Sequence, residues 1–433
     1  MSWKRSALAA LAVGALLAGP MATPVVGQGR AALLAPAKPE DLGFSSARLG
    51  KLDAAMKAAI DRGQVPGVIT YIARHGKQVH YSIQGKADLA SGAPLKPDTI
   101  FRMYSQTKPV TGVAMMILFE EGRWRLDDPV TKFVPEFKNL KVFKGVDAKG
   151  QMILEPVARD ATMRELMTHT AGFAYGLVTT NPVDAAYREA GLLGGDSLQE
   201  VMTRAGALPL ANQPGEEWRY SIAVDVQGYI VEKLSGQTLP EFMEQRIFKP
   251  LGMKDTAFWV PPAKRDRLAS LYMVDREKGV IPADGFMVLD ITKPPGAANG
   301  GGGLVSTVAD YARFAQMLLN GGEFDGARIL SPSTVKLMAS NHLTPEQLAK
   351  APLGNGNGFG LDFAVVMDPA AAGYGVGKGA FSWGGAAGTW FWIDPENDLF
   401  VMGMIHVLGG GGAYRLEELS QQLVYAALID PSK

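Results

Sequence analysis

Hydrophobic positions near the start of the chain follow first a helical and then a strand-like pattern. Between residues 45 and 61, apolar residues recur at intervals of three or four, as on one face of an amphipathic helix. Residues 67–73 are rich in β-branched and aromatic side chains, and residues 78–83 alternate between apolar and polar. The turn-forming stretch 74–77 separates these two segments. The pattern therefore predicts a helix followed by a β-hairpin.

The middle of the chain, from about residue 105 to residue 320, has mostly helical patterns joined by loops that contain proline and glycine. Candidate helices cover residues 108–121, 163–169, 198–205, 222–235, 239–247 and 308–319. Strand patterns return at residues 389–393 and 399–407, and a last amphipathic helix covers residues 415–428. This order predicts an α+β fold, in which both ends of the chain form one antiparallel sheet flanked by helices. A mostly helical subdomain is then inserted at roughly residues 120–300.

The first 27 residues differ in composition from the rest of the chain. Lys4 and Arg5 precede an apolar run at residues 7–18, which is too short to span a bilayer comfortably. This pattern predicts a signal peptide over residues 1–27 and a secreted or periplasmic protein, with an uncleaved anchor as the alternative. Residues 28–40 are rich in alanine, proline and glycine and predict a linker. The remaining chain, residues 41–430, would form one domain.

Composition excludes several kinds of partner and chemistry. The 433 residues include 43 basic and 43 acidic side chains, and removal of the signal leaves a net charge of about −2. We therefore expect no nucleic-acid partner and no stable membrane anchoring after signal cleavage. The chain has no cysteine, so disulfides, thiolate metal sites and a cysteine nucleophile are absent. No histidine pair has the spacing of metal ligands, and no cofactor is implied.

Ser105 and Lys108 stand three residues apart at the start of an apolar run. On a helix both side chains would lie on one face. A serine hydroxyl becomes a good nucleophile when a neighbour takes its proton, and a lysine amine can take it when the amine is neutral. A helix N-terminus would favour the negative charge that develops beside the serine, and Pro109 fits a first helical turn. A four-residue pattern arises often by chance, so its context decides.

Two further segments have features that an acyl-transfer site requires. Tyr220 stands just before a predicted helix, and a phenol beside a lysine ammonium can pass protons between a nucleophile and a leaving group. Trp383, Gly384 and Gly385 stand just before a predicted strand. Glycines let a strand approach a ligand closely and direct its N–H groups at an oxyanion.

Together these motifs resemble those of the serine β-lactamase and penicillin-binding-protein superfamily. The chain carries Ser-x-x-Lys at 105–108, Tyr-Ser at 220–221 and Trp-Gly-Gly at 383–385, in the order and at the separations of the class C-like branch. It is most similar to the family VIII carboxylesterases of that branch. Other segments typical of the branch are residues 100–128, 166–172, 300–320 and 383–406. The resemblance covers about residues 41–428 and implies a β-lactamase/transpeptidase-like fold for the domain.

The resemblance also implies a two-step mechanism. Ser105 would be acylated by a substrate carbonyl, and Lys108 and Tyr220 would share the proton transfers. The backbone N–H groups of Ser105 and Ala386 would form the oxyanion hole. Water would then hydrolyse the acyl-enzyme without a metal or cofactor.

Two departures from the β-lactamase pattern bear on the substrate. The asparagine that usually ends the tyrosine motif and binds the substrate amide is here Ile222, which cannot make that hydrogen bond. The lysine and threonine of the third motif are replaced by Trp383 and Gly384, which removes a positive charge. We therefore expect Trp383, Gly384, Gly385 and Ile222 to contact the substrate, and the substrate to be a small neutral ester rather than an anionic β-lactam.

Other functions stay open on the sequence alone. The same motifs serve class C-type β-lactamases, D-alanyl-D-alanine carboxypeptidases or other peptidases, and acyltransferases, while a non-catalytic binder of cell-wall peptides is a remoter alternative. His169 is interpreted as a structural residue at a helix end, because the chain lacks the Gly-x-Ser-x-Gly context of a serine–histidine–aspartate triad. Asp225, which follows Tyr220 on the predicted helix, is a further candidate for a bond within the site.

Overall fold

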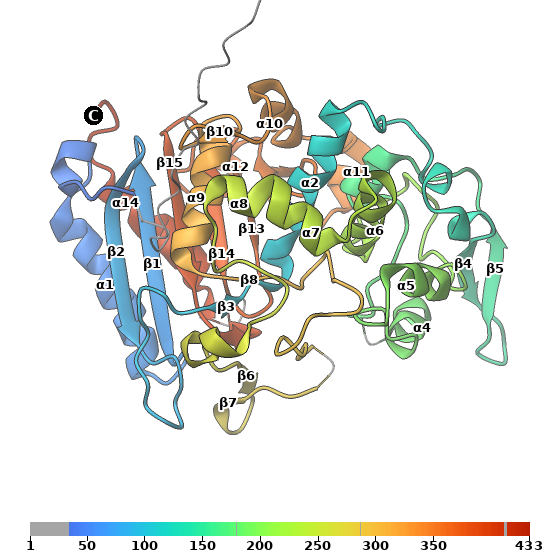
Figure 1. Cartoon of the computed structure of the whole chain (residues 1–433), viewed down its shortest axis with the longest axis horizontal. Coiled ribbons are helices and arrows are strands. Elements are labelled where there is room, and N and C mark those ends of the chain that lie inside the picture. The colour runs from blue at the N-terminus through green and yellow to red at the C-terminus, as the bar shows by residue number, and fades with distance from the viewer. Residues whose placement is uncertain (1–33, 179, 286, 411–413) are drawn as a thin grey trace, which may run out of the picture. The chain divides into compact units, whose positions relative to one another are not determined.

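Seven strands form the central antiparallel sheet of the computed structural model (Figure 1). The model describes residues 34–178, 180–285, 287–410 and 414–433. The sheet order is β11-β12-β13-β14-β15-β1-β2. The strands are β1 (Gly67–Arg74), β2 (Lys77–Gly85), β11 (Asn357–Phe359), β12 (Ala364–Val366), β13 (Phe381–Gly384), β14 (Trp390–Asp394) and β15 (Leu399–Met404). The predicted hairpin thus pairs with the C-terminal strands, which confirms the sheet built from both ends of the chain.

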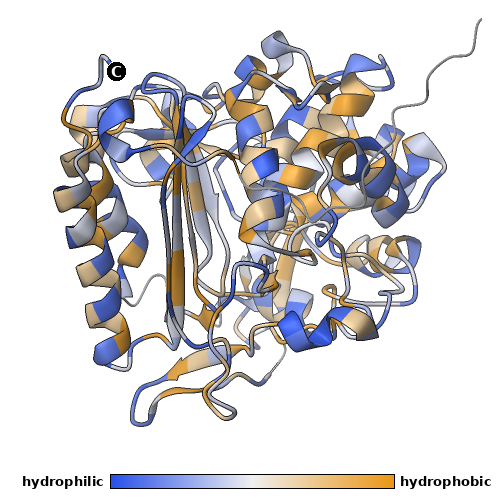
Figure 2. Cartoon of the chain, turned by 60° about the vertical axis from the view of Figure 1, so that its left-hand side comes forward, coloured by the Kyte–Doolittle hydropathy of each residue, from blue (hydrophilic) through white to orange (hydrophobic). Residues whose placement is uncertain are grey.

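Three neighbouring strands of the sheet, β14, β15 and β1, are buried at every position, because helices cover both faces of the sheet. Figure 2 shows the sheet nearly edge-on between its helices. On one face lie α1 (Ser46–Asp61) and α14 (Leu416–Ala427), whose apolar residues pack with Trp390 and Trp392. On the other face, α9 (Val308–Leu319) packs against β14 and β15.

The helix α2 (Lys108–Glu120) is buried from Lys108 to Leu118, so it has no solvent-facing side over that length. It packs against α6 (Ala223–Ser235), the nearest helix of the part drawn on the right of Figure 1. That part also contains α3 (Met163–Met167), α4 (Pro182–Glu189), α5 (Leu198–Ala205) and the hairpin of β4 (Lys141–Val146) and β5 (Met152–Pro156). The helices α7 (Leu239–Met243) and α8 (Lys249–Leu251) are drawn nearer the middle, between α9 and α6. The remaining short helices are α10 (Pro332–Met338), α11 (Pro345–Lys350) and α12 (Pro369–Ala372).

Two predicted elements are divided in the structure. The predicted strand 399–407 ends at Met404, and the next strand, β16 (Val407–Leu408), pairs in parallel with β6 (Tyr272–Asp275) outside the main sheet. Strand β6 also pairs with β7 (Gly279–Pro282). The predicted helix 239–247 changes to a π-helical turn at Glu244–Phe248. The division of the strand follows from its pairing with β6, a tertiary contact that a local pattern does not contain.

The predicted signal peptide, residues 1–27, and most of the predicted linker lie outside the described residues. The end of that linker is described: the amide of Ala37 donates to the carbonyl of Gln78 on β2 at 3.0 Å, and a 3₁₀-helix covers Pro39–Leu42. No helix within the described part of the chain is long and apolar enough to cross a membrane.

Candidate active site

Ser105 stands where a strand turns sharply into a helix. Strand β3 (Phe101–Arg102) leads to Tyr104, whose φ of 46° lies in the left-handed region. A side chain other than glycine costs about 1–3 kcal/mol in such a conformation and persists only where the surroundings hold it. A 3₁₀-helix at Tyr104–Thr107 follows and runs directly into α2. Ser105 therefore lies in this tight turn, just ahead of α2, at the helix N-terminus where the sequence predicts it.

Hydrogen bonds from distant segments hold this turn. The hydroxyl of Thr107 accepts from the amide of Leu304 at 3.1 Å, and Tyr311 donates its hydroxyl proton to the carbonyl of Gln106 at 3.0 Å. Tyr104 donates to the carbonyl of Met287 at 2.9 Å. Because these partners lie far away in the sequence, Ser105 is positioned by the whole domain.

Lys108 lies beneath the nucleophile and is only 1% exposed. Its Nζ donates to Ser105 Oγ at 3.2 Å, to the hydroxyl of Tyr175 at 3.1 Å and to the carbonyl of Gly301 at 2.6 Å. The rings of Tyr175 and Tyr220 lie 4.9 and 4.5 Å from Nζ. The structure therefore brings the predicted nucleophile and its lysine partner into contact.

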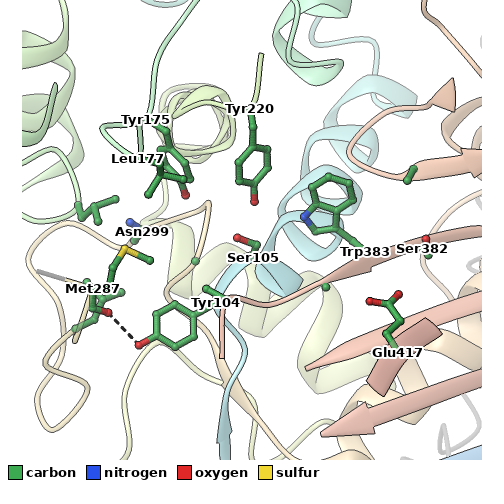
Figure 3. A pocket seen from close by; sticks show the side chains of 16 residues that line it. Tyr104, Ser105, Tyr175, Leu177, Tyr220, Met287, Asn299, Ser382, Trp383 and Glu417 are labelled. Carbon is green, nitrogen blue, oxygen red and sulfur yellow. Dashed lines mark hydrogen bonds between the residues drawn. The ribbon is translucent and has the colours of Figure 1, made fainter. Parts of the chain in front are cut away.

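Tyr220 lies above Ser105 and points its hydroxyl toward it (Figure 3). Within the described residues this buried hydroxyl makes no hydrogen bond. Its ring packs against Tyr175 and Trp383, with centroids 5.3 and 5.6 Å away. The phenol is thus held by packing, and its polar end is left for the reacting groups.

His169 packs beside Tyr220, with ring centroids 4.9 Å apart. It stands after the end of α3, its Nδ1 shares a 3.1 Å hydrogen bond with Ser221 Oγ, and its carbonyl accepts from the amide of Arg219 at 2.8 Å. Burial and the nearby Lys108 hold the pKa of His169 well below its usual value. A neutral, buried ring of this kind fits the structural role that the sequence indicates.

Two buried carboxyl groups lie behind Lys108. Asp225 accepts from the amide of Gly301 at 3.1 Å, and Asp362 accepts from the side chain of Gln227 at 3.0 Å. Burial raises the pKa of Asp225 to about 6 and that of Asp362 to about 8, and Lys108 opposes both shifts. Near neutral pH the pair carries mainly one negative charge, which is a counter-charge for an ammonium on Lys108.

Residues 299–303 form the wall beside these groups. A β-carbon on Gly301 would lie 2.7 Å from Asp225 Oδ2 and 3.0 Å from the hydroxyl of Tyr175, and one on Gly300 would lie 2.7 Å from the carbonyl of Val224. Only glycine at these two positions lets the backbone of this loop approach Asp225, Tyr175 and Val224 so closely. The sequence shows them only as a short glycine-rich loop.

The predicted oxyanion hole lies where the turn between β13 and β14 meets the nucleophile. A β-carbon on Gly385 would lie 2.3 Å from the carbonyl of Met103, so only glycine lets this turn approach so closely. Ser105 and Ala386 both line the same cavity. In the described part of the chain, neither backbone amide donates a hydrogen bond, which leaves both available to an oxyanion.

A cavity of about 450 Å³ opens above Ser105. It is lined by Tyr104, Ser105, Tyr175, Leu177, Leu193, Tyr220, Met287, Leu289, Asn299, Gly302, Ala364, Ser382, Trp383, Gly384, Ala386 and Glu417. Among the predicted substrate contacts, Trp383 and Gly384 line this cavity. Gly385 is not among the lining residues, and neither is Ile222, which is 1% exposed at the start of α6.

Five polar residues of the cavity were not predicted as site residues: Tyr104, Tyr175, Asn299, Ser382 and Glu417. The side-chain oxygen of Asn299 is buried and has no hydrogen-bond donor within the described residues. Asn299 directly precedes four glycines, which is the one local signal that marked this wall. Tyr175 and Glu417 carry no comparable signal.

The chain is similar to known proteins over most of its length. The family described as Beta-lactamase matches residues 52–425. Protein Rv1367c of Mycobacterium tuberculosis is 38% identical over 361 residues, which cover 81% of this chain and 88% of that protein. Esterase EstB of Burkholderia gladioli is 30% identical over 406 residues, which cover 87% of this chain and 95% of EstB.

A solved structure is similar over most of the chain as well. It is that of EstCE1, described as a hydrolase with promiscuous acyltransferase activity, and it matches with a TM-score of 0.74 at 26% identity. The match covers 89% of this chain and 99% of EstCE1. The likeness thus extends through the sheet, α2 and the helical part together.

Proposed function

This chain belongs to the beta-lactamase family and is a serine hydrolase that acts on esters, and from this premise we propose that it is an exported carboxylesterase with Ser105 as its nucleophile. The observation that carries the proposal is the 3.2 Å contact between Lys108 Nζ and Ser105 Oγ below an open cavity. Within the family, the Trp-Gly-Gly motif at 383–385 favours the family VIII carboxylesterases.

In the first step, Ser105 Oγ attacks the ester carbonyl carbon, and its proton passes to whichever of Lys108 and Tyr220 enters the step deprotonated, as the neutral amine or as the phenolate. The carbonyl oxygen becomes an oxyanion that the amides of Ser105 and Ala386 stabilise, at about 2.7–4 kcal/mol for each donor. The bond to the alcohol oxygen then breaks. The alcohol leaves with the proton, and the acyl group stays on Ser105.

In the second step, water attacks the acyl carbon and gives its proton to the same pair. The tetrahedral intermediate collapses, the carboxylic acid leaves, and the pair returns a proton to Ser105 Oγ. The step reverses the first with water in place of the alcohol, so no further residue is needed.

The walls of the cavity favour esters over anionic β-lactams. No lysine, arginine or histidine in the described ranges lines the cavity, so a carboxylate of the substrate meets no cation there. Trp383 replaces such a cation with an indole ring. Because an unpaired carboxylate loses solvation in such a site, neutral substrates bind better.

A direct test compares p-nitrophenyl butyrate with nitrocefin, using the mature protein and its Ser105→Ala variant. We expect rapid cleavage of the ester, slow or no cleavage of nitrocefin, and a loss of roughly a thousandfold or more in Ser105→Ala. If nitrocefin is the better substrate, the protein is a β-lactamase. If neither is cleaved, a peptidase or a binder of cell-wall peptides replaces the esterase proposal.

A second candidate function is transfer of the acyl group to an alcohol, since EstCE1 is described as having that activity as well. A cavity of about 450 Å³ leaves room for an alcohol beside the acyl group. Gas chromatography of a reaction with added butanol measures this: butyl butyrate formed only with intact Ser105 supports transfer, and free butyrate alone contradicts it.

The proposal that the protein is exported rests on the signal-like pattern of residues 1–27. We expect the full chain, expressed in a Gram-negative host, to be found in the periplasm with its signal removed, and a chain that begins after residue 27 to stay in the cytoplasm. Immunoblots of cell fractions measure both. Retention of the full chain in the membrane with its signal intact contradicts the proposal and indicates an anchor.

A further inference from the structure

Glu417 lines the active-site cavity but has no part in the mechanism above. It lies in the first turn of α14, and its carboxyl group points from the helix toward β13 (Figure 3). Its Oε2 lies 3.8 Å from the position that a β-carbon on Gly384 would occupy. The carboxyl group therefore borders the same space as the end of β13 that carries Trp383.

The side chain of Glu417 has no partner of its own in the described part of the chain. The neighbouring Glu418 is ion-paired with Arg415, whereas Glu417 makes neither an ion pair nor a side-chain hydrogen bond there. An acidic side chain in the first turn of a helix interacts favourably with the helix dipole, and Glu418 already supplies one to α14. The dipole therefore does not explain why Glu417 also is acidic and turns into the cavity. A partly buried carboxylate without a partner is costly, and a bound ligand could supply that partner.

The surroundings of the Glu417 carboxyl suit a cation. It is the only carboxyl group among the described residues of the cavity lining, and the aromatic rings of Tyr104, Tyr220 and Trp383 line the same space. Aromatic faces and a carboxylate both attract a positive charge, and more strongly where water is excluded. Lys108 is only 1% exposed below Ser105, and its Nζ already donates three hydrogen bonds. It therefore leaves the carboxyl free for a ligand.

The charge of Glu417 depends on pH in the physiological range. Burial, with the neighbouring Glu418 adding to it, raises the pKa of Glu417 to about 7. Burial, with the charges of Glu417 and Glu418 adding to it, also raises the pKa of Tyr374. A bound cation would favour the ionised form of Glu417.

We propose that Glu417 forms a subsite for a positively charged group, so that the enzyme prefers esters whose acyl or alcohol part carries an ammonium group. This inference rests on the proposed esterase function and names its substrate class. The ammonium group would lie between the carboxylate and the aromatic wall while the ester carbonyl lies at Ser105.

Two pairs of esters test the subsite, and the members of each pair have the same shape but differ by one charge. The first pair is butyrylcholine and the neutral ester in which carbon replaces the quaternary nitrogen. The second pair is the p-nitrophenyl ester of trimethylammoniobutyric acid and its neutral carbon isostere. The first pair places the cation on the alcohol side and the second on the acyl side. The measured quantity is kcat/KM for each ester.

We expect wild type to prefer the cationic member of at least one pair by about tenfold at about pH 8. Glu417→Gln should lose this preference through a larger fall in activity on the cationic ester than on its neutral partner, and a urea denaturation curve like that of wild type shows that the variant is folded. Glu418→Gln, the matched control on the same helical turn, should keep the preference. At about pH 6 the wild-type preference should shrink, because Glu417 is then mostly protonated.

A preference for the neutral member in both pairs overturns the inference, and so does a cationic preference that survives in Glu417→Gln. If the neutral esters are cleaved well and charge has no effect, the esterase function stands and only the subsite fails. If none of the four esters and no p-nitrophenyl butyrate is cleaved, the esterase proposal fails and the subsite fails with it.

Discussion

Nζ of Lys108 contacts the nucleophile, a tyrosine hydroxyl and a backbone carbonyl. These three contacts fix the position of Nζ relative to Ser105. It also separates the two tyrosines: Tyr175 holds the lysine, whereas Tyr220 presents a free hydroxyl to the cavity.

Substitution of the two tyrosines should therefore have unequal effects. Tyr175→Phe loses one hydrogen bond to Lys108, and we expect kcat for p-nitrophenyl butyrate to fall about tenfold. Tyr220→Phe loses a proton-transfer group, and we expect a fall of roughly 10²–10⁴-fold. Tyr187→Phe is the control, because Tyr187 is buried outside the cavity. A larger loss in Tyr175→Phe than in Tyr220→Phe would reverse the two roles.

The sequence predicts the residues of the site that form motifs and misses those that stand alone. Ser105, Lys108 and Tyr220 meet in the structure as their motifs indicate. Glu417 lies on a different helix and has no local pattern, so only the fold brings it to the cavity. Ile222 packs in the hydrophobic core, and its amide donates to the carbonyl of Ala174 at 3.1 Å; local sequence does not contain these contacts.

At the scale of elements, strand β15 passes directly beside a tryptophan of β14. A β-carbon on Gly403 would lie 2.0 Å from two ring atoms of Trp390. Gly403→Ala should therefore lower the free energy of unfolding by about 1–3 kcal/mol, measured by urea denaturation. In the control Gly50→Ala, on the exposed side of α1, no atom lies within 4 Å of the new β-carbon, and stability should rise by up to about 1 kcal/mol. Equal stability in both variants would contradict this packing.

The segment between β15 and β16 contains a buried histidine. His406 is 2% exposed between the rings of Phe101 and Tyr272, and burial lowers its pKa to about 4 from 6.5. Between about pH 4 and pH 6.5, His406 therefore binds a proton in the unfolded chain but not in the folded chain. The contribution of neutral His406 to the free energy of unfolding is fully present above about pH 6.5. It falls by roughly 3 kcal/mol as the pH drops toward 4.

His406→Gln removes that titrating group. We expect the variant to lose less stability than wild type between about pH 7.5 and pH 5, measured by urea denaturation at both pH values. The comparison concerns the change with pH, so any constant cost of the substitution cancels. An identical loss in both proteins would show that His406 is not responsible.

Local patterns predict the bounds of helices that pack one apolar face against the core. The helices at 198–205 and 308–319 have the predicted bounds, because each has one apolar face against the core. The strand 399–407 is divided because its last residues pair with β6, which lies more than a hundred residues earlier. A pairing of that kind depends on topology and not on the residues of the strand itself.

At the scale of the whole molecule, Arg74 joins segments from both ends of the described chain. It is 2% exposed, and it donates to the carbonyls of Leu42 at 2.9 Å, Asn397 at 2.9 Å and Pro431 at 2.7 Å. A buried guanidinium satisfied by backbone carbonyls fixes their relative positions. The order of the elements and the resemblance of the motifs predict the fold class. Neither predicts that Arg74 links the two ends of the domain.

Arg74→Met should leave those carbonyls buried without a donor. We expect the free energy of unfolding to fall by on the order of 3 kcal/mol, measured by thermal and urea denaturation, with kcat per folded molecule unchanged because the active site lies elsewhere. Arg62→Met, at an exposed arginine after α1, is the control and should change stability little. A loss of activity without a loss of stability would contradict this role.

The central claim is that Ser105 forms the covalent intermediate, and labelling with a p-nitrophenyl phosphonate ester tests it most directly. Peptide mapping by mass spectrometry should find one phosphonyl group per protein, on Ser105, appearing at the rate at which esterase activity is lost. Ser105→Ala should take up none. A label on another residue that accompanies the loss of activity, or full activity in Ser105→Ala, would contradict the account.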